Sequence, residues 1–496
     1  MGVKAALSLP FAKYVVRVND KWKNNAVKVQ QDLMIFLCKH AQNTSFGKTH
    51  SFSEIKNYLD WKKNIPIRNY EDIKDYVQKI IDGEIDVLWP GKPIYFCKTA
   101  GTTSGSKYIP ITKDSLPHHI KAARDAILSY IAETKNTNIV NGKMIFIQAS
   151  PELTKTGEIL TGRLSGIVAH HIPAYLTKNR LPSFKTNCID DWEEKVDAIV
   201  EETLPENMTL ISGIPPWVHM YFEKLQAKTG KLIKDIFPNF DLFIYGGVNF
   251  DPYRQSFEKV IGKKMDRVEL YPASEGFIAY QDSQGDKGML LCVNHGIFYE
   301  FIPSEEFFEE NPTRISLANV ELEVNYVIIL STNAGLWGYN IGDTIKFVSL
   351  NPFRIVVTGR IEHFTSAFGE HVIAQEVEKS LKKVLEKFSA RVNEFHVAPQ
   401  VSPKNGLPFH EWFIEFDKQP ADLYAFTKEL DVNLQDLNSY YKDLISGSVL
   451  KPLEITLIKK GGFVQYMKCE GKLGGQNKVP RLANDRKVAN QLRGFV

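Results

Sequence analysis

Apolar residues recur every three or four positions along about the first 90 residues of the chain, which is the spacing of an amphipathic helix. This pattern predicts helices over 22–41 and 53–61, and again over 70–81 after a break at Pro66. We therefore expect residues 1 to about 90 to form a helical layer that supports the rest of the fold.

Helix and strand patterns alternate from about residue 116 onward. Helices are predicted over 116–134, 190–203, 217–229 and 252–261, and strands over 144–148, 209–212, 242–245 and 267–271. Strands that are separated by helices indicate a largely parallel sheet with helices on both faces. Ligands of such folds gather at the carboxyl ends of the strands.

Beyond Gly288 the pattern changes to short strands joined by turns, over 289–293, 297–301, 320–324, 326–331, 344–347 and 354–358. After residue 360, helices over 372–388, 421–430 and 434–444 accompany strands over 394–397, 411–416 and 453–457. The predicted fold class is α/β. A large N-terminal domain, residues 1–360, has mostly parallel helix-covered sheets plus a β-barrel-like subdomain, and residues 361–496 form a smaller mobile C-terminal α/β domain.

Composition narrows the class of protein. The chain of 496 residues is 43% hydrophobic and 24% charged, as in an ordinary globular protein. Its 61 basic and 58 acidic residues leave a net charge of +3, which indicates neither a nucleic acid nor a membrane as partner. No run is apolar enough to span a bilayer. The five cysteines lack metal-ligand spacing, so we expect reduced thiols and a cytoplasmic location.

The run Thr99–Lys107 lies between two strand-like segments and has the composition of a phosphate-binding turn. Its central residues are Gly101, Thr102, Thr103, Ser104 and Gly105. Glycines let the backbone approach an anion, hydroxyls donate hydrogen bonds, and Lys107 adds a positive charge. Ser106 separates Gly105 from Lys107, so this is not the common nucleotide loop. A plain hairpin remains the structural alternative.

Two predicted strands end in residues suited to a nucleotide. Gly246 and Gly247 would let a flat ring lie against the backbone, and Ser274 with Glu275 could hold Mg²⁺ between phosphate oxygens. A tight turn and a helix N-terminus are the alternatives. Asp343 follows a glycine turn, where a carboxylate can accept both hydroxyls of a ribose or form an Asx-turn.

An apolar, aromatic run after the strand over 209–212 offers a lining for a small ring or chain. We assign Trp217, His219 and Tyr221 to this acid pocket, although aromatics at helical spacing also serve as core. The histidine pairs at 118–119 and 170–171 lack metal spacing and receive no ligand role.

Several of these stretches, taken in order, resemble the motifs of adenylate-forming enzymes, which include acyl-CoA synthetases, peptide-synthetase adenylation domains and luciferases. Thr99–Lys107 is similar to their phosphate loop, and Tyr271 to Glu275 is similar to their Tyr-Gly-x-Thr-Glu segment. Tyr339 to Asp343 is similar to their Tyr-Arg-x-Gly-Asp. Gly359-Arg360 and the segment 369–378 resemble the hinge motif that follows.

Within that superfamily the chain more closely resembles the acyl acid amido synthetases known in plants as the Gretchen Hagen, auxin-responsive family, which also has bacterial members. Residues 298–303, Phe-Tyr-Glu-Phe-Ile-Pro, are similar to that family's Tyr-Phe-Glu-Phe-Leu-Pro. Residues 477–481, Asn-Lys-Val-Pro-Arg, are similar to its Tyr-Lys-Thr-Pro-Arg. Asn340 departs from the pattern because arginine is usual there, and the first loop is one residue shorter than in plants.

The resemblance implies an ATP-dependent ligase with two half-reactions. A small carboxylic acid would attack ATP to give an acyl-adenylate and pyrophosphate, and an amino acid or other amine would then form an amide. It implies Lys478, Ser274 and Glu275 as catalytic residues, with Glu275 also binding Mg²⁺. It implies nucleotide binding by Thr102, Thr103, Ser104, Gly105, Lys107, Gly246, Gly247, Tyr271, Asp343 and Arg360, and a hinge at Glu362.

Two other functions remain open at this point. An acyl-CoA ligase shares the first half-reaction and forms a thioester in the second. A non-catalytic nucleotide-binding protein would keep the fold and lose the chemistry. The sequence leaves open which acid and which amine react, and the oligomeric state.

Overall fold

The computed structural model describes residues 3–100, 106–172, 177–247, 250, 254–361, 364–365, 372–401, 403, 406–446, 449–474 and 477–496. The chain divides into two compact units. The first comprises Met1–Ile214, Lys234–Gly247 and Met265–Val356, and the second comprises Pro215–Ile233, Val248–Lys264 and Val357–Val496. The predicted domain boundary near residue 360 stays a prediction.

One mixed sheet of twelve strands, with the order β13-β12-β14-β15-β16-β11-β10-β9-β8-β7-β3-β6, forms the centre of the first unit. Its parallel part consists of β3 (Lys143–Ile147), β6 (Arg180–Leu181), β7 (Met208–Gly213), β8 (Leu242–Gly246) and β9 (Asp266–Ala273). The antiparallel strands continue the same sheet. They are β10 (Gly276–Tyr280), β11 (Met289–Leu291), β12 (Ile297–Pro303), β13 (Ile315–Ser316), β14 (Asn325–Thr332), β15 (Tyr339–Leu350) and β16 (Phe353–Arg360).

A second, smaller sheet in this unit carries the predicted phosphate segment. Its order is β2-β1-β5-β4, with β1 at Tyr95–Ala100, β2 at Ser106–Ile111, β4 at Thr154–Thr156 and β5 at Ile159–Gly162. Strands β1 and β2 are antiparallel neighbours, and Thr99 lies opposite Lys107. The two predicted strands are therefore present, and residues 101–105 between them lie outside the described part of the chain.

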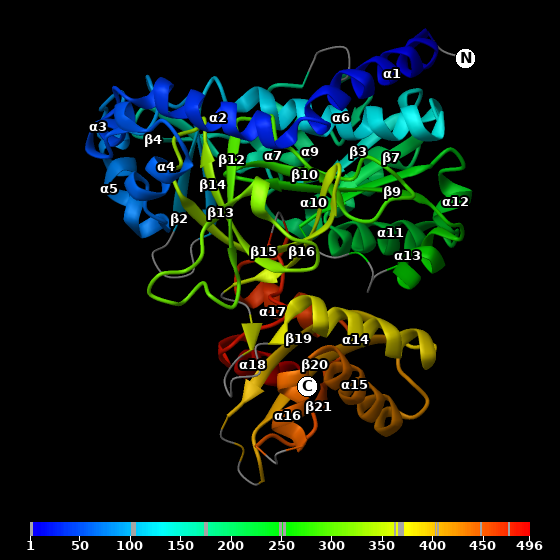
Figure 1. The fold of residues 1–496 in the computed structure, drawn as a ribbon. Coiled ribbons are helices and arrows are strands. Elements are labelled where there is room, and N and C mark those ends of the chain that lie inside the picture. Colours follow the sequence, from blue (N-terminus) through cyan, green and yellow to red (C-terminus); the bar gives the residue numbers. More distant parts are fainter. Residues whose placement is uncertain are drawn as a thin grey trace. The chain divides into compact units, whose positions relative to one another are not determined.

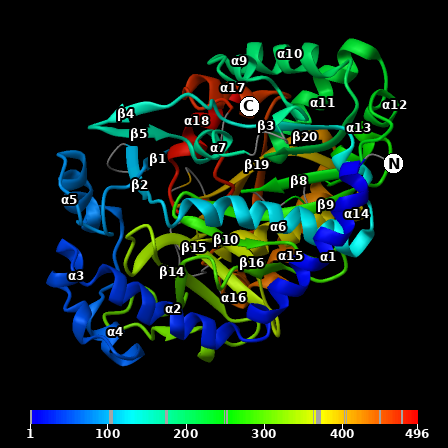
Figure 2. The same cartoon turned by 90° about the horizontal axis from the view of Figure 1, so that it is seen from above.

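Helices α1 (Val3–Lys23), α2 (Ala26–Ala41) and α6 (Leu116–Thr134) pack on one face of the large sheet, and Figure 2 shows α6 lying across β9 and β10 (Figures 1 and 2). The remaining helices of the first unit are α3 (Ser45–Thr49), α4 (Tyr58–Asn64), α5 (Tyr70–Ile81), α7 (Leu164–Ala169), α9 (Phe184–Asn187), α10 (Trp192–Thr203) and α12, whose span is Ile233–Ile236. Local signals set some of the ends. Asn69 and Asp72 form a capping box at the start of α5.

Three of the sequence predictions in this unit differ from the structure. The helix predicted over 53–61 is interrupted at residues 55–57, between a short 3-10 helix at Phe52–Glu54 and α4. Residues 320–324 form no strand, because Glu323 has φ of +62° and this left-handed conformation interrupts an extended backbone. The helix predicted over 22–41 is divided at Asn24 and Asn25, where α1 ends and α2 begins.

The second unit has a three-stranded sheet of β19 (Arg391–Gln400), β20 (Phe409–Lys418) and β21 (Glu454–Leu457). Trp412 and Ile414 pack with α14 (Ala374–Lys387), α15 (Leu423–Leu437) and α16 (Ser439–Ser446). Alternate residues of β20 point to the other face, where Phe413 packs with α17 (Gly462–Cys469) and α18 (Lys487–Leu492). Helices α11 (Pro215–Thr229) and α13 (Arg254–Ile261) also belong to this unit.

None of the helices in the described part of the chain combines the length and the apolarity that crossing a bilayer requires.

Candidate active site

Ser274 and Glu275 form a two-residue turn between β9 and β10. These strands are antiparallel, and Ala273 pairs with Gly276 across the turn. A strand follows Glu275, which excludes the helix N-terminus that the sequence left open. The turn therefore places a hydroxyl and a carboxylate on adjacent residues.

Cys97 lies in β1, two residues before the predicted phosphate segment, and its side chain contacts this turn. Its thiol donates a hydrogen bond to the hydroxyl of Ser274, with 3.1 Å between Sγ and Oγ. Burial is the main reason that the pKa of Cys97 is raised to about 12; the charge of Glu275 acts in the same direction and that of Arg163 acts against it. The thiol is therefore neutral near pH 7, and both charged groups lie close enough to act on it.

Lys107 is the second residue of β2, the return strand of the phosphate segment. Its Nζ lies 5.8 Å from the centre of the Tyr70 ring, and the Tyr70 hydroxyl accepts a hydrogen bond of 2.9 Å from the backbone N–H of Tyr108. Tyr70 thus lies beside the base of the loop. The predicted residues Thr102, Thr103, Ser104 and Gly105 lie outside the described residues.

Tyr271 and Asp343 connect two further predicted segments. The Tyr271 hydroxyl donates a hydrogen bond of 2.5 Å to Oδ2 of Asp343. Gly246 is paired with Leu270 on the neighbouring strand, and a Cβ at Gly246 would lie 2.4 Å from the Leu270 carbonyl oxygen. Only glycine fits this close approach of two strands without a shift of the backbone. Gly247 follows with φ of +80°.

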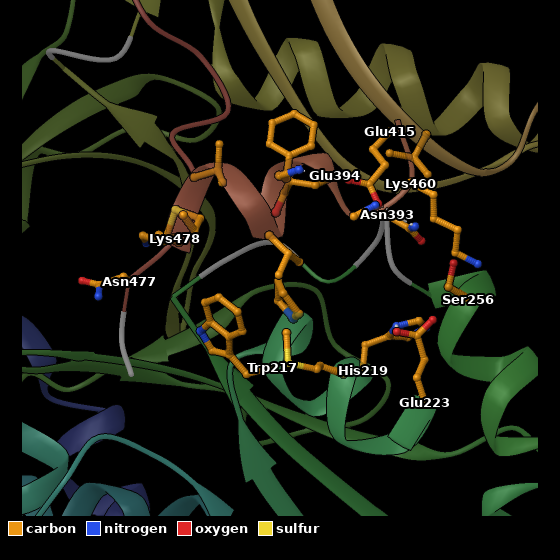
Figure 3. A pocket seen from close by; sticks show the side chains of 18 residues that line it. Trp217, His219, Glu223, Ser256, Asn393, Glu394, Glu415, Lys460, Asn477 and Lys478 are labelled. Atoms are coloured by element: carbon orange, nitrogen blue, oxygen red, sulfur yellow. Dashed lines mark hydrogen bonds and ion pairs between the residues drawn. The ribbon is translucent and has the colours of Figure 1, made fainter. Parts of the chain in front are cut away.

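A cavity of about 240 Å³ lies within the second unit. Its wall comprises Pro216, Trp217, His219, Met220, Glu223, Ser256, Val392, Asn393, Glu394, Glu415, Lys460, Gly461, Phe463, Val464, Met467, Asn477, Lys478 and Val479. Three residues predicted from the sequence, Trp217, His219 and Lys478, therefore line one cavity (Figure 3). Tyr221 does not line it, because this side chain is fully buried and its ring packs against Phe222.

Polar groups gather at one part of the cavity wall. Nδ1 of His219 lies 3.6 Å from Oε2 of Glu223, one helical turn further along α11. The hydrogen bond with His219 is the main reason that the pKa of Glu223 is lowered, and the positive charge of Lys460 acts in the same direction. Ser256 contributes a hydroxyl from α13.

Glu415 also lines the cavity. This buried carboxylate accepts hydrogen bonds from the backbone N–H of Gly461 at 2.9 Å and of Phe463 at 3.2 Å, and from the Asn393 amide at 3.1 Å. It therefore satisfies orphan N–H groups at the start of α17 and fixes this helix against the sheet.

Three models of one family match most of this chain. The GH3 family N-terminal domain matches residues 17–188, the GH3 family central domain matches residues 290–360, and the GH3 family C-terminal domain matches residues 373–487. The chain belongs to the GH3 family.

Curated GH3 relatives are similar over nearly their full length. Jasmonoyl--L-amino acid synthetase JAR6 of Nicotiana attenuata is 21% identical, with 92% of this chain and 91% of that protein covered. Indole-3-acetic acid-amido synthetase GH3.15 of Arabidopsis thaliana is 22% identical, with 88% of this chain and 87% of that protein covered.

Solved structures agree on the fold. AtGH3.15 acyl acid amido synthetase in complex with 2,4-DB has a TM-score of 0.79 at 16% identity, and 98% of this chain and 96% of that chain are covered. The 2-hydroxyisobutyryl-CoA ligase in its postadenylation state has a TM-score of 0.60 at 12% identity, with 94% and 92% covered. The GH3 chain thus has the fold of adenylate-forming enzymes.

Asn340 has a structural role in this GH3 chain. Its Oδ1 accepts a hydrogen bond of 2.8 Å from the backbone N–H of Gly342, directly before Asp343. The backbone N–H of Asn340 donates to the carbonyl of Arg68 at 2.7 Å. Asparagine at this position therefore supports the local backbone, while the charge of the usual arginine is absent.

Two predicted residues of the GH3 chain remain, Arg360 and Glu362. Arg360 ends β16 as an exposed residue and belongs to the second unit, whereas Asp343 belongs to the first. Glu362 lies outside the described residues. Sequence reasoning missed Glu223, Ser256 and Lys460. Only Glu223 carried a signal, because it follows His219 by four residues on a helix.

Proposed function

We propose that this protein is an acyl acid amido synthetase, which adenylates a small carboxylic acid with ATP and transfers the acyl group to an amine, forming an amide. The observation that carries the proposal is the convergence of separate segments in the first unit. Cys97 of β1, the strand that leads into the phosphate segment, contacts Ser274, and Tyr271 of β9, the strand that leads to Ser274, contacts Asp343. Membership in the GH3 family supports the same reaction.

The nucleotide is held by groups from these segments. Lys107, with Thr102, Thr103, Ser104 and Gly105 of the loop, binds the departing phosphates. Asp343 accepts the hydroxyls of the ribose, aided by Arg360, and Gly246, Gly247 and Tyr271 receive the adenine. Displacement at phosphorus needs mainly positioning and charge neutralisation, so this set of hydroxyls, amides and cations suits the first half-reaction.

The Glu275 carboxylate is suited to binding Mg²⁺ together with the phosphates of a nucleotide. Within the described ranges no three His, Cys, Asp or Glu side chains form a metal site of their own. Mg²⁺ is commonly held by one or two carboxylates together with substrate phosphates, so a single carboxylate beside the Ser274 hydroxyl fits it. When bound, Mg²⁺ neutralises phosphate charge. Ser274 lies toward the α-phosphate.

Lys478 is the cation that stabilises charge on the α-phosphate during adenylation.

We place the hinge between the two half-reactions at Glu362, which divides a domain of residues 1–360 from one of residues 361–496. We assign the acid pocket to Trp217, His219 and Tyr221 of α11, of which Trp217 and His219 line the cavity and Tyr221 lies in the core. The location in the cytoplasm stays a prediction, supported by five free cysteines.

Exchange of labelled pyrophosphate into ATP tests the first half-reaction. Jasmonate and indole-3-acetate begin the panel of acids because relatives are named for them. We expect exchange that depends on one acid, and an amide product when amino acids are added. Turnover that requires coenzyme A in place of an amine would replace the amide product with a thioester. Absence of exchange with every acid would contradict both enzyme functions.

A further inference from the structure

One part of the cavity wall carries polar groups without partners. This polar end comprises His219 and Glu223 of α11, Ser256 of α13, and Lys460 just before α17 (Figure 3). Ser256 is only 4% exposed, and its Oγ has no hydrogen-bond partner among the described residues. Nε2 of His219 is likewise buried without one. Leaving such groups unpaired costs free energy, so a ligand that bonds to them would gain affinity.

The charges of the polar end are mixed. Lys460 is positive, Glu223 is negative, and each acts on the other. Asp417 also lies near both, but Arg391 at 2.8 Å and Lys259 at 3.8 Å already compensate this carboxylate. The polar end therefore offers one cation and one anion to the cavity.

A zwitterion matches this arrangement. We propose that the polar end is the subsite for the amino acid that accepts the acyl group, with its carboxylate bound by Lys460 and Ser256 and its ammonium facing His219 and Glu223. The inference rests on the proposed amide synthetase. A second carboxylate on the acid substrate would also suit Lys460, but such a ligand would bring no cation to Glu223.

The apolar part of the same wall suits the amino acid's side chain. Met220 and Met467 also line the cavity and carry no charge. We therefore expect apolar amino acids to be better acceptors than charged ones.

The variant Lys460→Met tests the subsite. All standard amino acids are screened as acceptors with the wild-type enzyme, and the best acceptor is compared with its decarboxylated amine. We expect the KM of the amino acid to rise about tenfold or more in the variant. The KM of the decarboxylated amine and the rate of acid-dependent pyrophosphate exchange should stay unchanged. Ser256→Ala should raise the same KM by a smaller factor.

Two matched variants separate recognition from folding. Lys459→Met removes the neighbouring exposed lysine, which does not line the cavity, and should change no constant. Lys460→Arg keeps the charge and should retain most of the affinity for the amino acid. An unchanged KM in Lys460→Met with exchange intact would overturn the subsite.

The outcomes also distinguish the subsite from the proposed function. A higher KM for the acid in the exchange assay, with that of the amino acid unchanged, would assign the polar end to the acid. Absence of pyrophosphate exchange in the wild-type protein itself would contradict the proposed synthetase function. Pyrophosphate exchange without any amide product would contradict both the proposed amide reaction and the acceptor subsite.

Discussion

The hydroxyl of Tyr271 donates a hydrogen bond to Oδ2 of Asp343 across 2.5 Å, although 72 positions separate the two residues. Tyr271 lies near the end of β9, three residues before Ser274, and Asp343 lies in β15. The contact orients the carboxylate that we assign to the ribose and joins it to the strand that leads to Glu275.

Removing this hydroxyl should weaken nucleotide binding. Tyr271→Phe leaves the ring in place but removes the hydrogen bond that the Asp343 carboxylate accepts from this hydroxyl, so we expect the KM of ATP in pyrophosphate exchange to rise about tenfold. Tyr130→Phe is the control, since Tyr130 donates an equivalent bond of 2.8 Å to Asp266 at the other end of β9. Equal effects of the two substitutions would argue against a role for Asp343 in the site.

The Glu275 carboxylate should be needed for adenylation and not for folding. Glu275→Gln keeps the shape of the turn and removes its charge, so the exchange rate should fall about 100-fold or more while the unfolding midpoint stays the same. Glu158→Gln alters another turn carboxylate, with 84% of its side chain exposed, and should leave the rate unchanged. A normal rate in Glu275→Gln would remove this residue from the site.

Lys478 should act on the first half-reaction. Lys478→Ala should lower pyrophosphate exchange about 100-fold, because the cation no longer balances the charge that develops on the α-phosphate. Lys472→Ala, at a 58% exposed lysine of the same segment, should have little effect. If instead amide formation from added acyl-adenylate falls while exchange persists, Lys478 serves the second half-reaction.

Glu411 should stabilise the second unit. This carboxylate is 2% exposed and binds Arg486 at 2.6 Å and Arg493 at 2.8 Å. Glu411→Ala leaves Arg486 partly buried without its anion, so the free energy of unfolding should fall by about 3–5 kcal/mol. Glu454→Ala breaks an exposed pair with Lys451 and should cost about 0–1 kcal/mol. Urea unfolding followed by tryptophan fluorescence compares the two, and equal losses would contradict the assigned role of burial.

Acid should destabilise the fold through two histidines on α6. Burial lowers the pKa of both His118 and His119 from 6.5 to about 4. Between these values the unfolded chain binds more protons than the folded one. The free energy of unfolding should therefore fall as the pH falls from 6.5 toward 4, by up to about 1.4 kcal/mol per pH unit for each histidine.

Urea unfolding of the variant His119→Gln at several pH values isolates this effect. The variant should show a shallower loss of stability between pH 6.5 and 5 than the wild-type protein. The control His40→Gln changes an exposed histidine and should keep the wild-type slope. A slope that His119→Gln leaves unchanged would assign the acid sensitivity to other groups.

Local signals explain which elements were predicted accurately. The helices over 70–81 and 116–134 have the predicted bounds because the apolar spacing that predicts them lies within the segments themselves, and Asn69 caps the first helix. The prediction of a strand over 320–324 was wrong because the alternation of Val, Leu and Glu does not reveal that Glu323 adopts a φ of +62°. That conformation depends on the turn into which the residue is packed.

The amino-acid sequence by itself determined the α/β class and the order of the motifs that resemble those of adenylate-forming enzymes, and it nominated Ser274, Glu275 and Asp343 for the site, because spacing and residue type are local properties. Only the tertiary structure decided that Tyr271 binds Asp343, that Cys97 contacts Ser274, and that Ser256 and Lys460 share a cavity with His219. These relationships join segments far apart in the chain. The direction in which each side chain points is set by the packing of whole elements, which no short stretch of sequence contains.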